Sequence, residues 1–328
     1  MALKVTRQQA IRYRLIANNL TERLSPGEYV RAARNAIQDT YPRSALLSLH
    51  ARVAECEPTA WEDPGLVQLY SPRAAVHILP AADRDIFTVG RLPLDPAARE
   101  KVDEHARLAC AALRGSTLRG RDVSRKLGEH IRRGSATGRI GIRWDTRSVV
   151  FRELPSPEID ATEAGRELCR RHIHAFGPTT PLAFAWWAGM PNADAGKVWQ
   201  LLAADLTEVN LEGHSAWILA EDEAALRTRS TVEGVRLLPA EELRLFGRDR
   251  TGLFIAPMRQ MNLPLFDTFH PHGVVVNGEV IGSWGRRGGR VNIRVGRSLR
   301  PSTKEAIEAE AAAFPIPGAK ITVEFAVS

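Results

Sequence analysis

Two pairs of histidines are the clearest metal-ligand types in the sequence: His172 with His174, and His270 with His272. Side chains two residues apart face the same way only in extended backbone, whereas the first pair falls in a predicted helix, where they point to different faces. No Asp, Glu or Cys accompanies His270 and His272 at the spacing of a zinc site. The sequence therefore predicts no bound metal.

The motifs of covalent and nucleotide-dependent catalysis are also missing. The chain has no Gly-X-Ser-X-Gly elbow, no Cys near a His at a familiar spacing and no Walker A loop, and Gly285-Arg-Arg-Gly288-Gly289 matches no dinucleotide fingerprint. We expect no nucleotide cofactor. His50 and His77 lie in apolar segments and Trp186-Trp187 in a predicted helix, so we expect buried, structural roles for them.

One further polar segment could carry chemistry, and we call it the polar corner. In Ile37-Gln38-Asp39-Thr40-Tyr41-Pro42-Arg43, three polar side chains follow one another where one predicted helix turns into the next. By residue type alone, Gln38 is equally suited to satisfying backbone groups at a helix end. Spacing alone nominates no catalytic residue here.

Basic side chains are unevenly distributed along the chain. Its 328 residues carry 45 Lys and Arg against 38 Asp and Glu, a formal net charge of +7. Nine arginines and Lys126 lie between Arg114 and Arg147 with only three acidic residues, and residues 284–300 contain six arginines and no acid. Arginine clusters in Gly-rich segments are typical of phosphate contact. The charge therefore favours nucleic acid as a partner over a merely solvated surface.

The composition is that of an ordinary globular protein. It is 44% hydrophobic and 25% charged, which excludes a disordered or fibrous chain. Cys56, Cys110 and Cys169 are odd in number and lack Cys-X-X-Cys spacing, which indicates a reducing compartment rather than a disulfide framework. The sequence shows neither an apolar signal core nor about 18 consecutive apolar residues. We expect a cytoplasmic protein with no membrane segment.

The first two thirds of the chain contain three copies of a pattern in which helices are followed by a strand or hairpin; the order helix, helix, turn, helix and β-hairpin is typical of a winged helix. In the first repeat, the capping box Ser25-Pro-Gly-Glu28 predicts a helix to about residue 36. The third repeat is the clearest, with two strands paired across Glu212-Gly213. We expect three winged-helix units, at residues 1–92, 93–155 and 156–230.

Strands prevail after about residue 232. Val274-Val-Val-Asn277-Gly278-Glu-Val-Ile predicts a hairpin, because Asn-Gly readily adopts the positive φ angles of a type I′ turn. Residues 231–328 are therefore predicted to form a small β-rich scaffold that carries an Arg-rich hairpin. The expected fold class is α+β, with tandem winged helices packed on this scaffold.

Several of these segments resemble one family in order along the chain. The run from Ala36 through Ser44-Ala-Leu-Leu-Ser-Leu-His-Ala-Arg-Val53 resembles the signature of the AlkZ/YcaQ-like winged-helix DNA glycosylases, in which Leu-Gln-X-Gln-Asp-Pro-Arg precedes a similar leucine-rich helix. Further similar segments are Arg73-Ala-Ala-Val-His77-Ile-Leu-Pro80, residues 176–189, Val235-Arg-Leu-Leu-Pro239, Arg248-Asp-Arg250 and residues 275–284. The resemblance spans nearly the whole chain.

The resemblance implies an enzyme that removes alkylated purines from double-stranded DNA. Such enzymes cleave the N-glycosidic bond of N7-alkylguanine adducts, and in some members of interstrand crosslinks. An N7-alkylated purine is cationic and leaves readily, so the enzyme has mainly to place a water and stabilise positive charge on the sugar. In the family, a Gln-X-Gln or Gln-X-Asp pair holds that water, because residues two apart in extended backbone face the same way.

This sequence departs from the family pattern at the second position of that pair. Gln38 matches the first catalytic residue, but Thr40 occupies the second position and Asp39 replaces an apolar residue between them. Thr40 accepts a hydrogen bond from water but is a poorer base than a carboxylate or amide. Three alternatives stay open: Thr40 assists Gln38, a register change turns Asp39 inward as the base, or base excision has been lost.

The leading hypothesis is a monofunctional, metal-free DNA glycosylase. The alternative is a non-catalytic winged-helix DNA-binding protein, either a regulator or a lesion-binding factor. Charge and position nominate the following residues for contacts with phosphates or a groove: Arg43, Arg139, Arg143, Arg286, Arg287 and Arg290.

Overall fold

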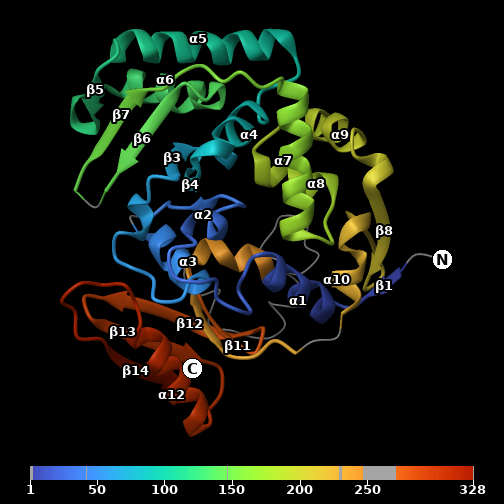
Figure 1. Ribbon diagram of the computed structural model, residues 1–328, viewed down its shortest axis with the longest axis vertical. Coiled ribbons are helices and arrows are strands. Elements are labelled where there is room, and N and C mark those ends of the chain that lie inside the picture. Colours follow the sequence, from blue (N-terminus) through green and yellow to red (C-terminus); the bar gives the residue numbers. More distant parts are fainter. Residues whose placement is uncertain (1–2, 42, 146, 229–230, 247–270, 328) are drawn as a thin grey trace.

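The computed structural model describes residues 3–41, 43–145, 147–228, 231–246 and 271–327. These residues form a mixed α/β structure with four small sheets, three of three strands and one of five, with helices packed among them (Figure 1). Arg248-Asp-Arg250 and His270 lie outside the described residues. Within the same ranges, no helix combines the length and apolar character needed to cross a bilayer.

The first sheet has the strand order β2-β4-β3, with β2 at Ile37–Gln38, β3 at Leu66–Tyr70 and β4 at Val76–Pro80. Helices α2 (Tyr29–Ala32), α3 (Ser44–Arg52) and α4 (Arg84–Val89) accompany it. The helix expected from Ser25 is reduced to the four residues of α2. Gly27 has φ +84°, so the chain turns there instead of entering a helix, although the Ser25 N–H still donates to the Glu28 carboxylate at 2.8 Å.

The second sheet has the order β5-β7-β6, with strands at Thr117–Arg119, Val149–Glu153 and Ile140–Trp144. Helices α5 (Pro96–Leu113) and α6 (Arg125–Gly134) pack against each other beside it. The Asp95 side chain caps α5 by accepting from the Ala98 N–H at 2.8 Å. The Ser124 side chain caps α6 by accepting from the Leu127 N–H at 3.2 Å.

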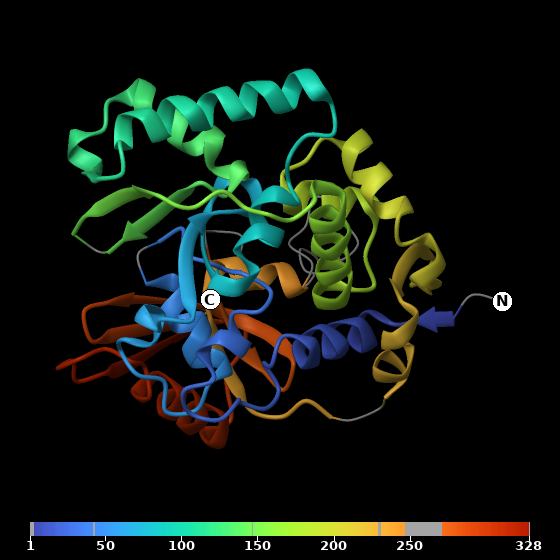
Figure 2. The ribbon, with the colours of Figure 1, turned by 45° about the horizontal axis from the view of Figure 1, so that its top comes forward.

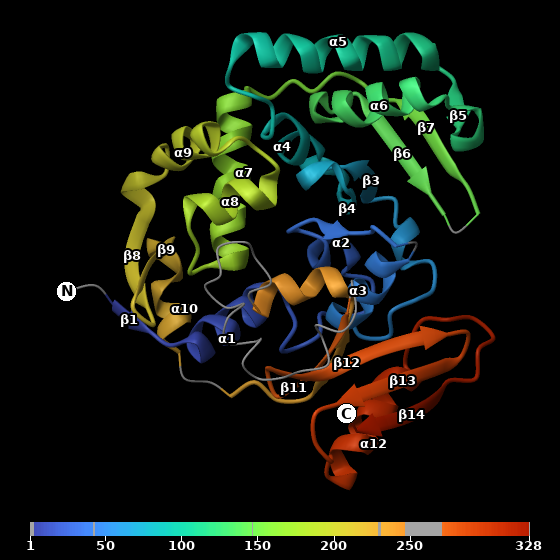
Figure 3. The same cartoon turned by 180° about the vertical axis from the view of Figure 1, so that it is seen from behind.

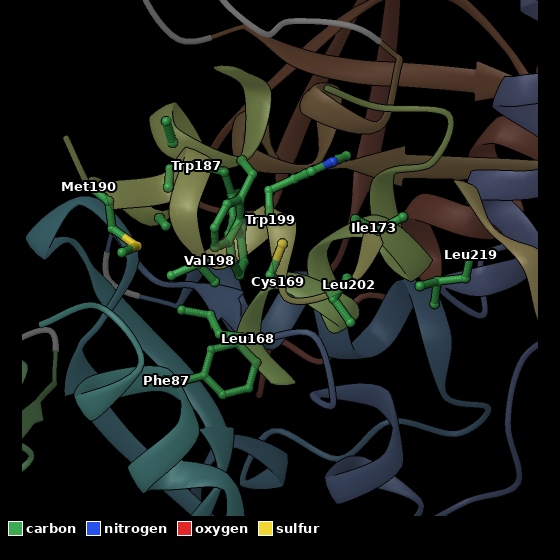
Figure 4. Close-up of a cluster of buried hydrophobic side chains, with 14 of the residues drawn as sticks. Phe87, Leu168, Cys169, Ile173, Trp187, Met190, Val198, Trp199, Leu202 and Leu219 are labelled. Carbon is green, nitrogen blue, oxygen red and sulfur yellow. The ribbon is translucent and has the colours of Figure 1, made fainter. Parts of the chain in front are cut away.

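The third group contains α7 (Ala161–Phe176), α8 (Pro181–Ala188), α9 (Asn192–Gln200), α10 (Glu223–Arg227) and the hairpin β8 (Leu206–Leu211) and β9 (His214–Leu219). Its core gathers Phe87 of α4 with Leu168, Trp187 and Trp199 (Figure 4). Strand β1 (Leu3–Val5) pairs in parallel with β8, and α1 (Arg7–Ala17) packs against α7 and α10. The first residues of the expected first unit thus contribute to the sheet of the third.

The remaining sheet follows chain order: β10 (Val235–Leu238), β11 (His272–Val276), β12 (Glu279–Arg287), β13 (Arg290–Val295) and β14 (Thr322–Val327). Helix α12 (Pro301–Ala312) packs against β10 and β14. Asn277 and Gly278 have φ of 49° and 78°, which confirms the turn predicted from their sequence. A 3₁₀ helix, η8 (Ala240–Phe246), follows β10.

Two hairpins project toward the same side of the molecule. Figures 1, 2 and 3 place the ends of β6–β7 and β12–β13 on one edge, with the segment around α3 between them. The tandem winged-helix interpretation and the bounds of its four predicted units stay predictions. The structure matches the expected mixture of helices and small sheets.

Candidate active site

The polar corner begins in a strand and not at a helix end. Ile37 and Gln38 form β2, in which Ile37 pairs with Ile78 and Gln38 with His77 of β4. The Ile37 side chain is buried, whereas that of Gln38 is only half-buried. The expectation that the chain turns there directly from helix to helix is wrong, because a short strand paired with β4 separates α2 from α3.

Two guanidinium groups bind the side-chain amide of Gln38. Its Oε1 accepts from Arg73 Nη2 at 2.5 Å and from Arg244 Nη1 at 2.6 Å. Guanidinium groups only donate, so these contacts define which amide atom is the oxygen. The Nε2 atom then donates to the Thr40 hydroxyl. Gln38 and Thr40, two residues apart in extended backbone, thus lie side by side, with both lone pairs of the amide oxygen engaged.

A tight turn brings Arg73 to Gln38. Arg73 has φ 57°, and its Nη1 donates to the carbonyl of Trp187 at 2.9 Å. The turn packs against Gly189 at the end of α8, where a Cβ would lie 2.8 Å from the Arg73 Cα. Burial and the nearby Arg244 lower the pKa of the Arg73 guanidinium. The Arg73 side chain is thus held from two sides.

Asp39 points away from this pair, into the protein. It is fully buried, and its Oδ1 accepts from the Ala45 N–H at 3.0 Å at the first turn of α3, while Oδ2 accepts from Gln68 Nε2 at 3.0 Å. Burial raises the pKa of Asp39, and the Ala45 N–H, Arg43 and other donors oppose that rise. Its carboxylate therefore ties the corner to α3 and β3.

A narrow polar cavity adjoins Gln38. Its free volume of about 30 Å³ is enough for a water molecule. Asn35 and Gln38 line one part of it, and Glu241 and Arg244 of η8 another. Asn35 Oδ1 and Glu241 Oε2 are buried without a hydrogen-bond partner in the part of the chain that the structure describes. Two unsatisfied acceptors on residues that line such a space favour an ordered water.

An ion pair fixes η8 in this position. Arg52 of α3 binds Glu242 through two bonds, Nη1 to Oε1 at 3.0 Å and Nη2 to Oε2 at 2.7 Å. The two side chains are only 5% and 10% exposed. Bidentate geometry constrains direction as well as distance, so the pair sets how η8 presents Glu241 and Arg244 to Gln38.

A much larger hollow lies elsewhere. Its volume is about 830 Å³, and its walls come from the start of α1, the β11–β12 turn and residues 297–303. Arg12, Arg297 and Arg300 line it together with Glu233 and Glu279, so both signs of charge are present. It contains none of the residues around Gln38.

Two of the arginines predicted to contact DNA meet around one tryptophan. The guanidinium carbons of Arg43 and Arg143 lie 3.3 and 3.8 Å from the ring centroid of Trp61, a cation–π geometry. Arg43 also donates to the Trp144 carbonyl, and Arg143 pairs with Glu62 at 2.5 Å. This cluster joins the segment before α3 to the β6–β7 hairpin.

The other predicted arginines are spread over the two hairpins. Arg139 pairs with Glu153 at 3.0 Å and Arg290 with Glu324 at 3.4 Å. Arg286 is exposed and donates to the carbonyl of Gly288. Arg287, at the end of β12, is exposed. The structure thus brings Arg43 and Arg143 together, while Arg286, Arg287 and Arg290 gather separately at the β12–β13 turn.

His77, His172 and His174 contact other protein groups. His172 is buried and stacks on Phe176, and His174 contacts Asp222 at 3.0 Å. His77 is buried and contacts the Ala75 carbonyl through Nδ1 at 3.0 Å. Across residues 3–41, 43–145, 147–228, 231–246 and 271–327, no three metal-ligating side chains form a group.

Sequence reasoning missed Arg73, Arg244 and Glu241. Arg73 lies in one segment that resembles the family, and another such segment, Val235–Pro239, immediately precedes η8. Neither segment carries a local sequence signal of contact with Gln38. Arg73 is 35 positions from Gln38, and Arg244 is 206 positions away. Such separations leave no local signal in the sequence.

Comparisons with known proteins identify the family and the fold. A family model described as DNA glycosylase AlkZ-like matches residues 32–315. An interstrand DNA cross-link repair glycosylase of Streptomyces sahachiroi is 26% identical over 136 residues, which are 40% of this chain and only 36% of that relative. The solved structure of Streptomyces sahachiroi DNA glycosylase AlkZ has the same fold, with a TM-score of 0.76 at 18% identity over 99% of this chain and 100% of the other. Because the family model covers most of its length, the chain belongs to the AlkZ-like DNA glycosylase family.

Proposed function

We propose that this protein hydrolyses the N-glycosidic bond of N7-alkylated purines in double-stranded DNA as a monofunctional glycosylase. The observation that carries the proposal is the pair Gln38 and Thr40, held by two guanidinium groups beside a polar cavity large enough for a water. Membership of the AlkZ-like family supports it. Gln38 positions the water, and Thr40 assists.

The chemistry suits these weak groups. An N7-alkylated purine carries its own positive charge, so C1′–N9 cleavage releases a neutral base without protonation by the enzyme. What remains is to deliver water to C1′ on the face opposite the departing base. The fixed amide of Gln38 needs no reorganisation during the reaction. In this proposal Asp39 has no direct part and maintains the corner through its bonds to α3.

The DNA path follows the edge on which both hairpins project. We propose that Arg43 and Arg143 at Trp61 and the exposed Arg286 and Arg287 contact phosphates on that edge. Ion pairs such as Arg143–Glu62 must then loosen or share their guanidinium with the phosphate. The Streptomyces sahachiroi relative is named as an interstrand cross-link repair glycosylase, which makes such crosslinks the second substrate class to test.

The test is release of 7-methylguanine from a methylated duplex. We expect wild-type protein to release the base and leave alkali-labile abasic sites, and Gln38→Ala to slow release by about 10²-fold or more, as loss of a positioned catalytic group does. DNA without protein corrects for spontaneous loss. Thr40→Val removes the hydroxyl while keeping its shape and should cost less. If Gln38→Ala is as fast as wild type, Gln38 has no part in the mechanism.

A second candidate is a DNA-binding protein that does not cleave. It is favoured by Thr40 at the position where the family has an amide or carboxylate, and by an amide oxygen of Gln38 that two arginines already saturate. In that case the protein binds the alkylated duplex, with affinity falling steeply as salt rises, and leaves the base in place. Gel shift and abasic-site detection on the same duplex separate the two candidates.

A further inference from the structure

We infer that Glu241 is the catalytic base of this site and replaces the second polar residue of the family pair. The inference rests on the proposed function and names a residue that the corner itself does not contain. It follows from three observations: the saturation of Gln38, the weakness of Thr40, and an unpaired carboxylate oxygen on Glu241, which lines the cavity beside Gln38.

Gln38 has no acceptor left for a water proton. Both lone pairs of Oε1 are used by Arg73 and Arg244, and one N–H donates to Thr40. The remaining N–H donates as well, so it holds a water through the water's oxygen. That contact places the nucleophile but does not accept its proton, and the Thr40 hydroxyl is a poor base.

Glu241 has the missing acceptor. Its Oε2 is buried with no partner among the described residues, and Glu241 and Gln38 line the same cavity. A buried acceptor without a donor is unfavourable unless it serves a bound group. A single water between the Gln38 N–H and Glu241 Oε2 satisfies both atoms. It also fits the free volume of about 30 Å³.

The step balances with no further reactant. The water oxygen forms a bond to C1′ while the C1′–N9 bond breaks, and the bonding pair stays on N9 of the cationic purine, which leaves as a neutral base. One water proton passes to the Glu241 carboxylate and is later released to solvent. Before transfer, the carboxylate charge also stabilises the positive charge on the sugar.

The charges around Glu241 determine how its activity depends on pH. Burial raises its pKa above the ordinary 4.5, Arg244 opposes the rise, and Glu242 and Asp39 add to it; Arg73 interacts with the same carboxylate. A base acts when ionised. Base release should therefore increase with pH through this raised pKa and become constant above it.

The experiment compares Glu241→Gln with Glu305→Gln, an identical chemical change at an exposed position of α12. Single-turnover release of 7-methylguanine is measured from pH 4.5 to 8.5. We expect Glu241→Gln to be slower by about 10²-fold or more at the wild-type plateau and to lose the rise with pH. Glu305→Gln should follow wild type. A duplex with a protonated pyrrolidine in place of the sugar should bind Glu241→Gln on the order of tenfold more weakly.

Each outcome decides the matter. Wild-type activity with an unchanged Glu241→Gln profile overturns the inference and leaves the proposed function intact, whereas an inactive wild type overturns both. If Glu241→Gln does not fold, Glu241→Asp replaces it. A slower enzyme that keeps the rise with pH then supports the inference, and a rate independent of pH refutes it.

Discussion

Replacing Glu242 by Gln should destabilise the protein strongly while leaving its shape unchanged. The Arg52–Glu242 pair is nearly inaccessible, with exposures of 5% and 10%, and bidentate. Removing one member of a buried pair costs about 3–5 kcal/mol, because the other charge stays buried without compensation. The Gln carbonyl still accepts one bond from Arg52, so we expect the lower end, about 3 kcal/mol, or roughly 6–12 °C in melting temperature.

The loss should depend on pH with a defined sign. Burial opposes ionisation of Glu242, but the Arg52 guanidinium outweighs it and holds the pKa of Glu242 below 4.5. A lowered pKa in the folded state gives stabilisation that is complete above the unfolded value and is lost as pH falls through the folded value. Wild type and Glu242→Gln should therefore differ most near neutral pH and converge as the pH falls below the lowered pKa of Glu242.

Urea unfolding followed by circular dichroism, at pH 7 and at a series of lower pH values, measures both effects. Replacing both members, Arg52→Met with Glu242→Leu, is the control, because an apolar pair of similar volume is often neutral or stabilising. That double variant should recover most of the stability. A Glu242→Gln midpoint equal to that of wild type at pH 7 would refute the assigned role of the pair.

Two further predictions concern the surroundings of Gln38 and the DNA edge. Gly189→Ala places a Cβ 2.8 Å from the Arg73 backbone at a residue with φ +73°, so it should lower the melting temperature and slow base release together, measured by calorimetry and the 7-methylguanine assay. Trp61→Ala removes the ring that Arg43 and Arg143 contact. It should weaken binding to undamaged duplex at all sequences and reduce the slope of log Kd against log salt by about one for each phosphate that the variant no longer neutralises.

The local elements could largely be predicted from the sequence. Asp95 and Thr180, residue types that favour helix N-caps, cap α5 and α8, and Asn277-Gly278 makes the turn predicted from its sequence. The prediction of a helix from Ser25 to about residue 36 was wrong, because a capping box does not outweigh Gly27, which the tertiary structure holds at positive φ. Strand β2 was missed because two residues are too few to show the alternation of apolar and polar side chains that indicates a strand. They form a strand only through their pairing with β4.

The candidate site was predictable only in part. Resemblance identified Gln38 and its neighbours, and the side-by-side placement of Gln38 and Thr40 follows from alternation in extended backbone. Arg73, Arg244 and Glu241 join them through long-range folding, for which a single sequence holds no local signal. The residue type of Asp39 suggests a catalytic carboxylate. In the structure, however, its buried side chain accepts a hydrogen bond from the Ala45 N–H in the first turn of α3.

Strand β1 has a consequence for biosynthesis. Residues 3–5 form a parallel pairing with residues 209–211, so strand β1 lacks this partner until about two hundred further amino acids have left the ribosome. At roughly 5–20 residues per second this takes about 10–40 s. Throughout that interval β1 waits undocked, and its sheet forms only after the intervening segments have been synthesised.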